Sequence, residues 1–164
     1  MIRQSASLAV FAIAVLGGSQ AAFADPLPKT GKISVHSAFR SYGDDAAQLS
    51  PTRMTLSGMF NGVLFNDKGS GPFHEGWVVC SYQGDLDNGA GGFVGSCAWT
   101  DADGDKAFAD YTGKFLSTGG SEGVNRLKGG TGKFTGIDAA GPFRCKFVAP
   151  GLYSCKQEFD YKLP

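Results

Sequence analysis

The sequence predicts an all-β protein, an antiparallel β-barrel of about eight strands. Three observations support this fold class. Glycine makes up 25 of 164 residues, more than twice its usual share of about 7%. Thirteen Phe, five Tyr and two Trp exclude a disordered glycine linker. Short runs of alternating apolar and polar residues, separated by turn signals, recur along the chain, as expected for strands with one buried face.

The N-terminal 24 residues predict an export signal. Arg3 supplies the basic start, Leu8 to Leu16 is a short apolar run, and Ala22-Phe23-Ala24 fits a cleavage site. That run is too short to span a bilayer as a helix, which needs about 20 residues. We expect cleavage before Asp25, which leaves residues 25–164 as a single barrel domain, periplasmic or secreted. An uncleaved N-terminal anchor is the alternative, and we expect no transmembrane segment after the signal.

The charge of the exported chain argues against polyanionic partners. Without Arg3, the chain carries 14 basic and 15 acidic residues, so its net charge is −1. Such a balance gives no electrostatic reason to expect nucleic acid or an anionic membrane surface as a partner. We expect no cofactor. A single chain leaves the oligomeric state open.

The N-terminal half of the domain predicts two or three strands. In Lys32 to Arg40, alternate residues are apolar, which indicates a strand, and Ser41 to Thr52 is expected to be a polar loop. Arg53 to Asn66 predicts two strands or one bent strand, because Gly58 and Gly62 interrupt an alternating pattern and indicate bulges or tight bends.

The dipeptide Asn88-Gly89 predicts a hairpin, because a type I′ turn needs positive φ at both central residues. With these two residues as the loop, Cys80 lies opposite Cys97 on a non-hydrogen-bonded pair, where side chains approach most closely. The register therefore predicts a disulfide between them. The glycines that follow the turn leave room for a longer loop or a bulge.

A second hairpin closes the chain. The segments around Phe143 and from Tyr153 to Leu163 alternate cleanly between apolar and polar residues. A three-residue loop, Ala149-Pro150-Gly151, places Cys145 opposite Cys155, whereas a Pro-Gly loop would set apolar against polar residues all along the ladder. Two disulfides are typical of an oxidising compartment. Metal binding is the competing use of the four cysteines, but no CxxC spacing occurs, and we expect no metal.

Further strands are expected over Asp105 to Leu116 and near Gly123 to Lys128, giving eight or nine in all. A closed barrel is favoured over a sandwich, because the long final strand would otherwise be an exposed edge. In the stretch GGTGKFTGI, glycines permit sharp backbone turns that let Phe134 and Ile137 reach inward as plugs. A phosphate-binding loop is excluded here, since the pattern GxxxxGK[ST] is absent.

The segments GGTGKFTGIDAAGPF, HEGWVVCSY and CAWTDADGD resemble the allene oxide cyclase barrel superfamily, in particular its exported bacterial members of unassigned function. The resemblance covers roughly residues 73–147, and with it we expect the barrel to be lipocalin-like or allene oxide cyclase-like in architecture. It implies an eight-stranded antiparallel barrel, trimeric in the plant proteins, whose cavity isomerises a fatty-acid epoxide. The plant catalytic residues have no counterparts that we can place, and the four cysteines and the export signal depart from the plant pattern. Cyclase activity is therefore not carried over.

Two charged clusters are candidate sites. Asp101, Asp103 and Asp105 resemble the start of a calcium loop, but Lys106 and Thr112 stand where a calcium loop needs Gly and a bidentate Glu. We favour a solvated turn over a cation site.

His74-Glu75 could be an acid–base pair, but neighbouring residues of a strand point to opposite faces, so we favour an ordinary pair at a strand edge. The catalytic residues, if the protein has any, stay unassigned.

Aromatic side chains are the candidates for a ligand site. Trp99, Phe60, Phe93 and Tyr82 could line a cavity for a small apolar ligand, or could fill the core. Under the Asn-Gly register Trp99 lies on the cysteine face and Trp77 on the opposite face. The sequence leaves a filled and a hollow barrel open, with the filled core favoured.

These features favour an exported, disulfide-stabilised β-barrel that binds a small apolar ligand or serves as a recognition module, without catalysis. Two alternatives stay open: an isomerase or cyclase acting on a hydrophobic, fatty-acid-like substrate inside the barrel, and a structural envelope protein.

Overall fold

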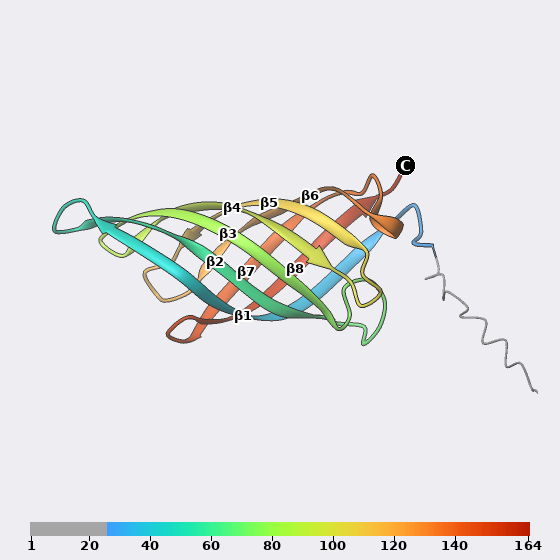
Figure 1. Ribbon diagram of the computed structural model, residues 1–164, viewed down its shortest axis with the longest axis horizontal. Helices are drawn as coiled ribbons and strands as arrows, with labels where there is room; N and C mark the ends of the chain where they lie inside the picture. Colours follow the sequence, from blue (N-terminus) through green and yellow to red (C-terminus); the bar gives the residue numbers. More distant parts are fainter. Residues whose placement is uncertain (1–25) are drawn as a thin grey trace, which may run out of the picture.

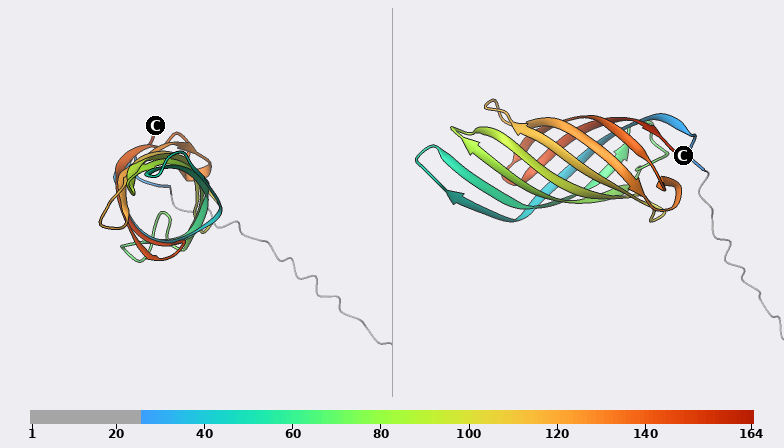
Figure 2. Two further views of the ribbon diagram at one scale, coloured as in Figure 1. Left: turned by 90° about the vertical axis from the view of Figure 1, so that its left-hand side faces the viewer. Right: turned by 90° about the horizontal axis from the view of Figure 1, so that it is seen from above.

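The chain forms one closed barrel of eight antiparallel strands, as the sequence predicts (Figure 1). The structure, a computed structural model, describes residues 26–164; the predicted export signal lies outside the described residues. Each strand pairs with the next one, and the last closes on the first, so the view along the axis is a complete ring (Figure 2). The strands are β1 (Thr30–Gln48), β2 (Arg53–Asn66), β3 (Gly76–Asp87), β4 (Ala90–Thr100), β5 (Lys106–Phe115), β6 (Ser121–Gly130), β7 (Asp138–Ala149) and β8 (Leu152–Lys162).

The first hairpin is longer than the sequence predicts. Strand β1 does not end near Arg40: it continues to Gln48, which pairs with Met54 of β2, so the expected polar loop is wrong. A register shift between Tyr42 and Asp45 lies across from the middle of β2, which is a single strand. Beyond the shift the hairpin projects past the other strands (Figure 1), and its β1 side chains are exposed. Both faces there meet water, so the alternation that would identify a strand is absent.

Both predicted disulfides are present, Cys80–Cys97 and Cys145–Cys155. The turn before β4 has φ of 51° at Asn88 and 78° at Gly89, the left-handed angles that a type I′ turn requires. Each pair of cysteines lies directly opposite across its hairpin, so the registers predicted from the alternation are confirmed. The disulfides indicate that the protein folds in an oxidising compartment.

The turn between β7 and β8 differs from the prediction in its detail. Ala149 pairs with Leu152, which leaves Pro150 and Gly151 as a two-residue turn rather than a three-residue loop. A bulge before Ala149 takes up one residue, so Phe147 still faces Tyr153. The bulge restores the register that a Pro-Gly turn alone would have shifted, and apolar residues keep facing apolar residues.

The glycine-rich stretch closes the barrel at the end where β6 passes into β7. Residues Gly132–Phe134 form a single 3-10 turn, and Phe134 and Ile137 are buried as predicted. Gly132 has φ of 52°, and a Cβ there would lie 1.7 Å from the Asp105 carboxylate. Only glycine allows the loop to lie this close to the preceding β4–β5 turn. Among residues 26–164, no helix is long and apolar enough to cross a membrane.

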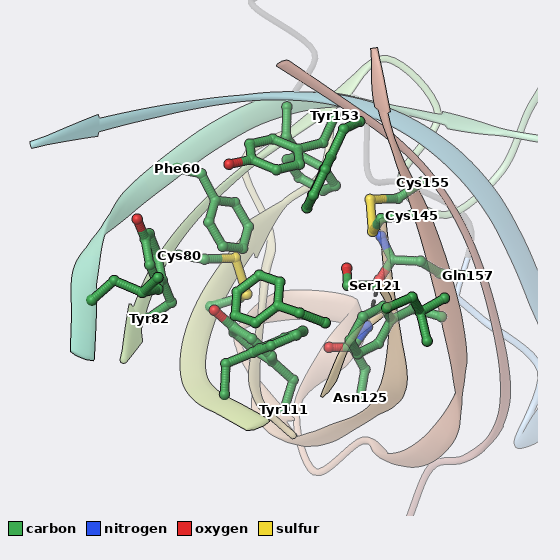
Figure 3. A pocket seen from close by; sticks show the side chains of 18 of the residues that line it. Phe60, Cys80, Tyr82, Tyr111, Ser121, Asn125, Cys145, Tyr153, Cys155 and Gln157 are labelled. Atoms are coloured by element: carbon green, nitrogen blue, oxygen red, sulfur yellow. Dashed lines mark hydrogen bonds between the residues drawn. A yellow bond between two sulfur atoms is a disulfide. The ribbon is translucent and has the colours of Figure 1, made fainter. Parts of the chain in front are cut away.

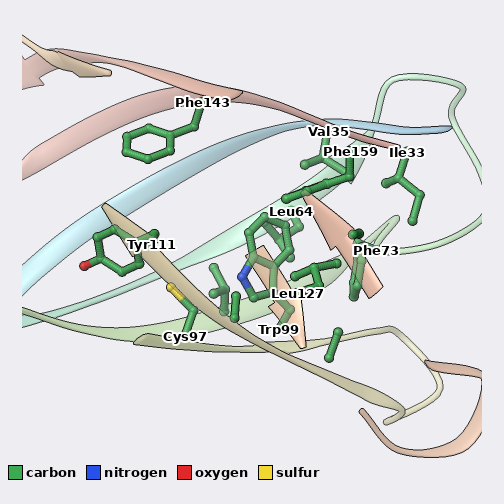
Figure 4. Close-up of a cluster of buried hydrophobic side chains, with 14 of the residues drawn as sticks. Ile33, Val35, Leu64, Phe73, Cys97, Trp99, Tyr111, Leu127, Phe143 and Phe159 are labelled. Atoms are coloured by element: carbon green, nitrogen blue, oxygen red, sulfur yellow. The ribbon is translucent and has the colours of Figure 1, made fainter. Parts of the chain in front are cut away.

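The core fills one half of the barrel. The fully buried side chains gather at the closed end, where both ends of the described chain also lie (Figures 1 and 4). They include Ile33, Val35, Leu64, Phe73, Val78, Trp99, Leu127, Phe134, Ile137 and Phe159. The other half holds a cavity. The sequence favoured a filled core, and the barrel is instead half filled.

Candidate functional site

A cavity of about 330 Å³ occupies the half of the barrel that contains the four hairpin turns (Figure 3). Small-molecule sites commonly enclose about 300–1,000 Å³, so this cavity lies at the small end of that range. We call the hairpin end the mouth. The residues at the mouth are Leu56, Leu86, Phe115, Leu116, Phe147 and Tyr153, all of which line the cavity.

The middle of the cavity has an aromatic wall built from five strands. Phe60 of β2 lies 6.1 Å, centroid to centroid, from both Tyr82 of β3 and Tyr111 of β5. Tyr111 in turn lies within 6.2 Å of Phe93 on β4 and Phe143 on β7. The inward phase of the pleat places one ring from each strand in the lumen. This wall suits an apolar ligand.

Trp99 lines the bottom of the cavity. Three buried rings, Phe73, Phe134 and Phe159, lie behind the cavity lining and support it, and we call these four rings the aromatic floor. Phe73 stacks on Phe134 with centroids 4.6 Å apart, and Trp99 packs edge-on against Phe73 and Phe159, each at 5.3 Å (Figure 4). Trp99 is 1% exposed. Its indole nitrogen is buried without a hydrogen-bond partner among the described residues, on the ring edge that faces Cys97 and Tyr111 (Figure 4).

Above the floor, one side of the cavity is polar. We call Ser37, Asn125 and Gln157 the polar wall; all three side chains are buried. Asn125 Nδ2 donates a hydrogen bond to Gln157 Oε1 at 2.5 Å. Gln157 Nε2 donates to Ser37 Oγ at 3.4 Å, and Ser37 Oγ donates to the Cys155 carbonyl oxygen at 3.5 Å, both of them long bonds. Asn125 and Gln157 line the cavity (Figure 3).

Gly141 leaves the space in which the side chains of Asn125 and Gln157 meet. Asn125 on β6 and Gln157 on β8 are separated by β7, where Gly141 is paired with Asn125. Gly141 has no side chain to occupy the lumen between the two amides. A Cβ there would lie 1.6 Å from the Glu158 carbonyl oxygen, so β7 also approaches β8 too closely for any other residue.

Within residues 26–164, no side chain that lines the cavity is charged at neutral pH. Among the described residues that line it, the ionisable side chains are three tyrosines, Tyr82, Tyr111 and Tyr153, since the cysteines are oxidised. Burial raises the pKa of both Tyr82 and Tyr111 well above the ordinary value, and the hydrogen bond to Asp44 raises the pKa of Tyr82 further. Tyr82 Oη donates to Asp44 Oδ1 at 2.9 Å, and Tyr111 Oη donates to the Ser81 carbonyl oxygen at 2.8 Å. These hydroxyls stay protonated at neutral pH.

The four residues singled out from the sequence as ligand candidates, Trp99, Phe60, Phe93 and Tyr82, all line the cavity. Trp99 is inside and Trp77, at 49% exposed, is outside, as the hairpin register predicts. The four cysteines also line the cavity, so the two disulfides hold its opposite walls.

Sequence reasoning missed the polar wall. The signal was present: Gln157 stands on the inward phase of β8 between Cys155 and Phe159. Asn125 likewise precedes the buried Leu127 by two residues on β6. A polar residue in the apolar phase of a strand therefore identifies a polar contact inside the barrel.

The aspartate cluster connects loops at the closed end of the barrel. Asp101, Asp103 and Asp105 form the predicted turn between β4 and β5, and residues 102–104 are exposed as expected. Asp101 differs from the expectation, since it is only 6% exposed. The ammonium group of Lys133 makes ion pairs with Asp101 and Asp103. Asp101 Oδ1 also accepts a hydrogen bond from the Phe73 backbone at 2.7 Å, and Asp105 Oδ2 accepts one from the Lys133 backbone at 3.0 Å. Within residues 26–164, no group of acidic, His or Cys residues has the geometry of a metal site.

His74 and Glu75 do not lie on a strand, so that expectation is wrong. They belong to the turn before β3, where Glu75 has φ of 53°. The turn directs the backbone around the buried Phe73 ring, which a regular strand could not do. His74 packs against Phe65, outside the cavity lining, and is not placed for acid–base chemistry in the lumen.

Comparison with known family models and with curated proteins finds no match for the chain. The closed eight-stranded barrel agrees with the fold that the allene oxide cyclase resemblance implies. The resemblance itself stays a prediction from the sequence segments.

Proposed function

We propose that the protein is an exported β-barrel that binds a small apolar molecule in the cavity of its open half. The observation that carries this proposal is the contrast between the two halves of one barrel. The closed half is packed with large side chains, whereas the open half holds about 330 Å³ of space lined mainly by rings and leucines. Interiors of proteins are normally packed tightly, so unfilled apolar space of this size favours an occupant.

Binding is favoured over catalysis by the chemistry of the lining. General acid–base catalysis needs a group that exchanges a proton near the working pH, such as His, Glu, Asp or Lys. Among the described residues that line the cavity, the titratable groups are tyrosines, and the pKa values of Tyr82 and Tyr111 are raised. An isomerase or cyclase activity therefore has less support than ligand binding without catalysis.

The proposal is tested with the fluorescent apolar probe N-phenyl-1-naphthylamine and the protein purified from the bacterial periplasm. We expect probe fluorescence to rise and to saturate at one probe per chain. Ser121→Phe should weaken binding at least about tenfold, because Ser121 lines the cavity and the added ring would fill it.

Ser154→Phe is the matched control, since Ser154 lies on the outer face of β8 and is exposed. This variant adds the same ring and should bind the probe like the unaltered protein. No saturable binding, or equal binding by the Ser121→Phe variant, would reject the cavity as the site.

A further inference from the structure

The deep end of the cavity differs chemically from its mouth. The mouth residues are apolar apart from the Tyr153 hydroxyl, whereas the deep end combines the Trp99 indole nitrogen with the amides of Asn125 and Gln157. The two polar features lie close together, because Phe159, two residues beyond Gln157 on the same face of β8, packs edge-on against Trp99. An apolar ligand that enters from the mouth therefore reaches the indole nitrogen and the two amides last.

Both features have unused hydrogen-bonding capacity. Trp99 Nε1 is a donor only, and no described residue accepts its hydrogen. In the polar wall, the Cys155 carbonyl oxygen can only accept, so Ser37 must donate to it, Gln157 must donate to Ser37, and Asn125 must donate to Gln157. That order leaves one hydrogen of Asn125 Nδ2, and its carbonyl oxygen, without a partner in the wall. Buried polar groups of folded proteins are rarely left unpaired.

The deep end has no charge to pair with an ion. No Lys, Arg or His, and no Asp or Glu, belongs to the described residues that line the cavity. A carboxylate or an ammonium group carried to the floor would lose its hydration without gaining a counter-charge, which is costly. A neutral oxygen loses much less and can accept the free hydrogens.

We propose that the ligand is a neutral molecule with an apolar body and one carbonyl or hydroxyl oxygen, bound with that oxygen at the deep end, against Trp99 Nε1 and the Asn125 amide. This inference rests on the proposed function and adds the chemical class of the ligand and its direction of entry. The apolar body lies against the aromatic wall and the mouth.

Three ten-carbon compounds test the class by displacement of N-phenyl-1-naphthylamine: decane, 2-decanone and decanoate. We expect 2-decanone to bind about tenfold more tightly than decane, because it satisfies donors that decane leaves unpaired. Decanoate should bind at least tenfold more weakly than 2-decanone at neutral pH. If decane and 2-decanone bind equally, or decanoate binds most tightly, the inference is wrong while the proposed function stands. If the probe itself does not bind, the proposed function fails.

The substitution Asn125→Leu tests whether the Asn125 amide binds the ligand oxygen. This variant should bind decane and 2-decanone with similar affinity, whereas Asn61→Leu, the same change on the exposed outer face of β2, should keep the preference for the ketone. A ketone preference that survives in the Asn125→Leu variant would remove Asn125 from the site.

A spectroscopic measurement covers the case in which Asn125→Leu does not fold. Trp77 is exposed, so Trp77→Phe leaves Trp99 as the chain's sole tryptophan and gives a single indole N–H signal in a nitrogen-15 correlation spectrum. Saturating 2-decanone should move this signal to lower field, as a new hydrogen bond does, and decane should not. Equal shifts with both compounds would overturn the inference.

Discussion

At the scale of single residues, Lys133 joins the two loops that close the barrel. Its side chain is 11% exposed and pairs with Asp101, which is itself buried and accepts a hydrogen bond from the backbone of Phe73. Burial alone would lower the pKa of Lys133, but the hydrogen bonds and charges of Asp101 and Asp103 together outweigh it, and the pKa is raised. The ammonium group therefore fixes the Asp101 carboxylate, which in turn positions the backbone of Phe73 in the aromatic floor.

Replacing this lysine should destabilise the fold. Lys133→Met leaves the Asp101 carboxylate buried without a counter-charge, which should lower the free energy of unfolding by about 3 kcal/mol in urea titrations. Adding Asp101→Asn should recover part of the loss, since the uncompensated charge is removed while the acceptor for Phe73 is kept.

Lys128→Met is the control, because Lys128 pairs with Asp110 on the exposed face and its loss should change stability little. An equally small effect of Lys133→Met would show that the buried pair does not support the floor.

Stability should also fall in acid. The hydrogen bonds from Ser34 and His36 lower the pKa of Asp67, and the hydrogen bond from Lys133 lowers the pKa of Asp103. A carboxyl whose pKa is lower in the folded state stabilises the fold above its ordinary pKa of about 4, and this contribution is lost as pH falls through the folded-state value. The melting temperature should therefore decline below about pH 4. A melting temperature that rises on acidification would contradict these assignments.

At the scale of elements, the two strands β7 and β8 show what alternation can predict. Their apolar phase places Cys145 opposite Cys155 and sends Phe143 into the lumen, and both features are present. The bulge near Ala149 was not predicted, because a turn and its bulge together preserve the same apolar pairing as a longer loop. The pattern therefore determines the register but not how the chain achieves it.

The close approach of β7 and β8 gives a prediction for Gly141. Gly141→Ala places a Cβ against the Glu158 carbonyl oxygen and forces the strands apart, so it should cost about 2 kcal/mol of unfolding free energy. Gly92→Ala is the matched control on β4, where the nearest atom to the new Cβ is 3.7 Å away. Thermal unfolding of the two variants should differ clearly, and equal melting temperatures would show that the strands have room to separate.

At the scale of the whole molecule, one barrel is divided into a packed half and a hollow half. Which half is hollow depends on how the rings of eight strands meet at each level, and this is a property of three-dimensional packing that no single strand encodes. The sequence therefore identified Phe60, Tyr82, Phe93 and Trp99 as lumen residues but could not say whether they enclose space. The polar wall was not predicted for a related reason. Asn125 and Gln157 lie on strands that are not neighbours, so their side chains meet only across a third strand.

A ligand that binds only the folded barrel should raise its stability. At a concentration one hundred times the dissociation constant, 2-decanone should add about 2.7 kcal/mol to the free energy of unfolding. For a chain of this size, the corresponding rise in melting temperature is on the order of 5–10 °C. The Ser121→Phe variant should show little or no rise, and an equal rise in that variant would indicate binding outside the cavity.

The central claim is that the hollow half is a binding site. The ligand enters it from the mouth, and its oxygen accepts hydrogen bonds at the deep end. The most direct measurement is a crystal structure of the protein grown with 2-decanone. The account predicts the ketone inside the barrel, with its oxygen about 3 Å from Trp99 Nε1 or Asn125 Nδ2 and its alkyl chain directed to the mouth. A barrel without ketone in its lumen at saturating concentration, or a ketone bound only on the outer surface, would contradict it.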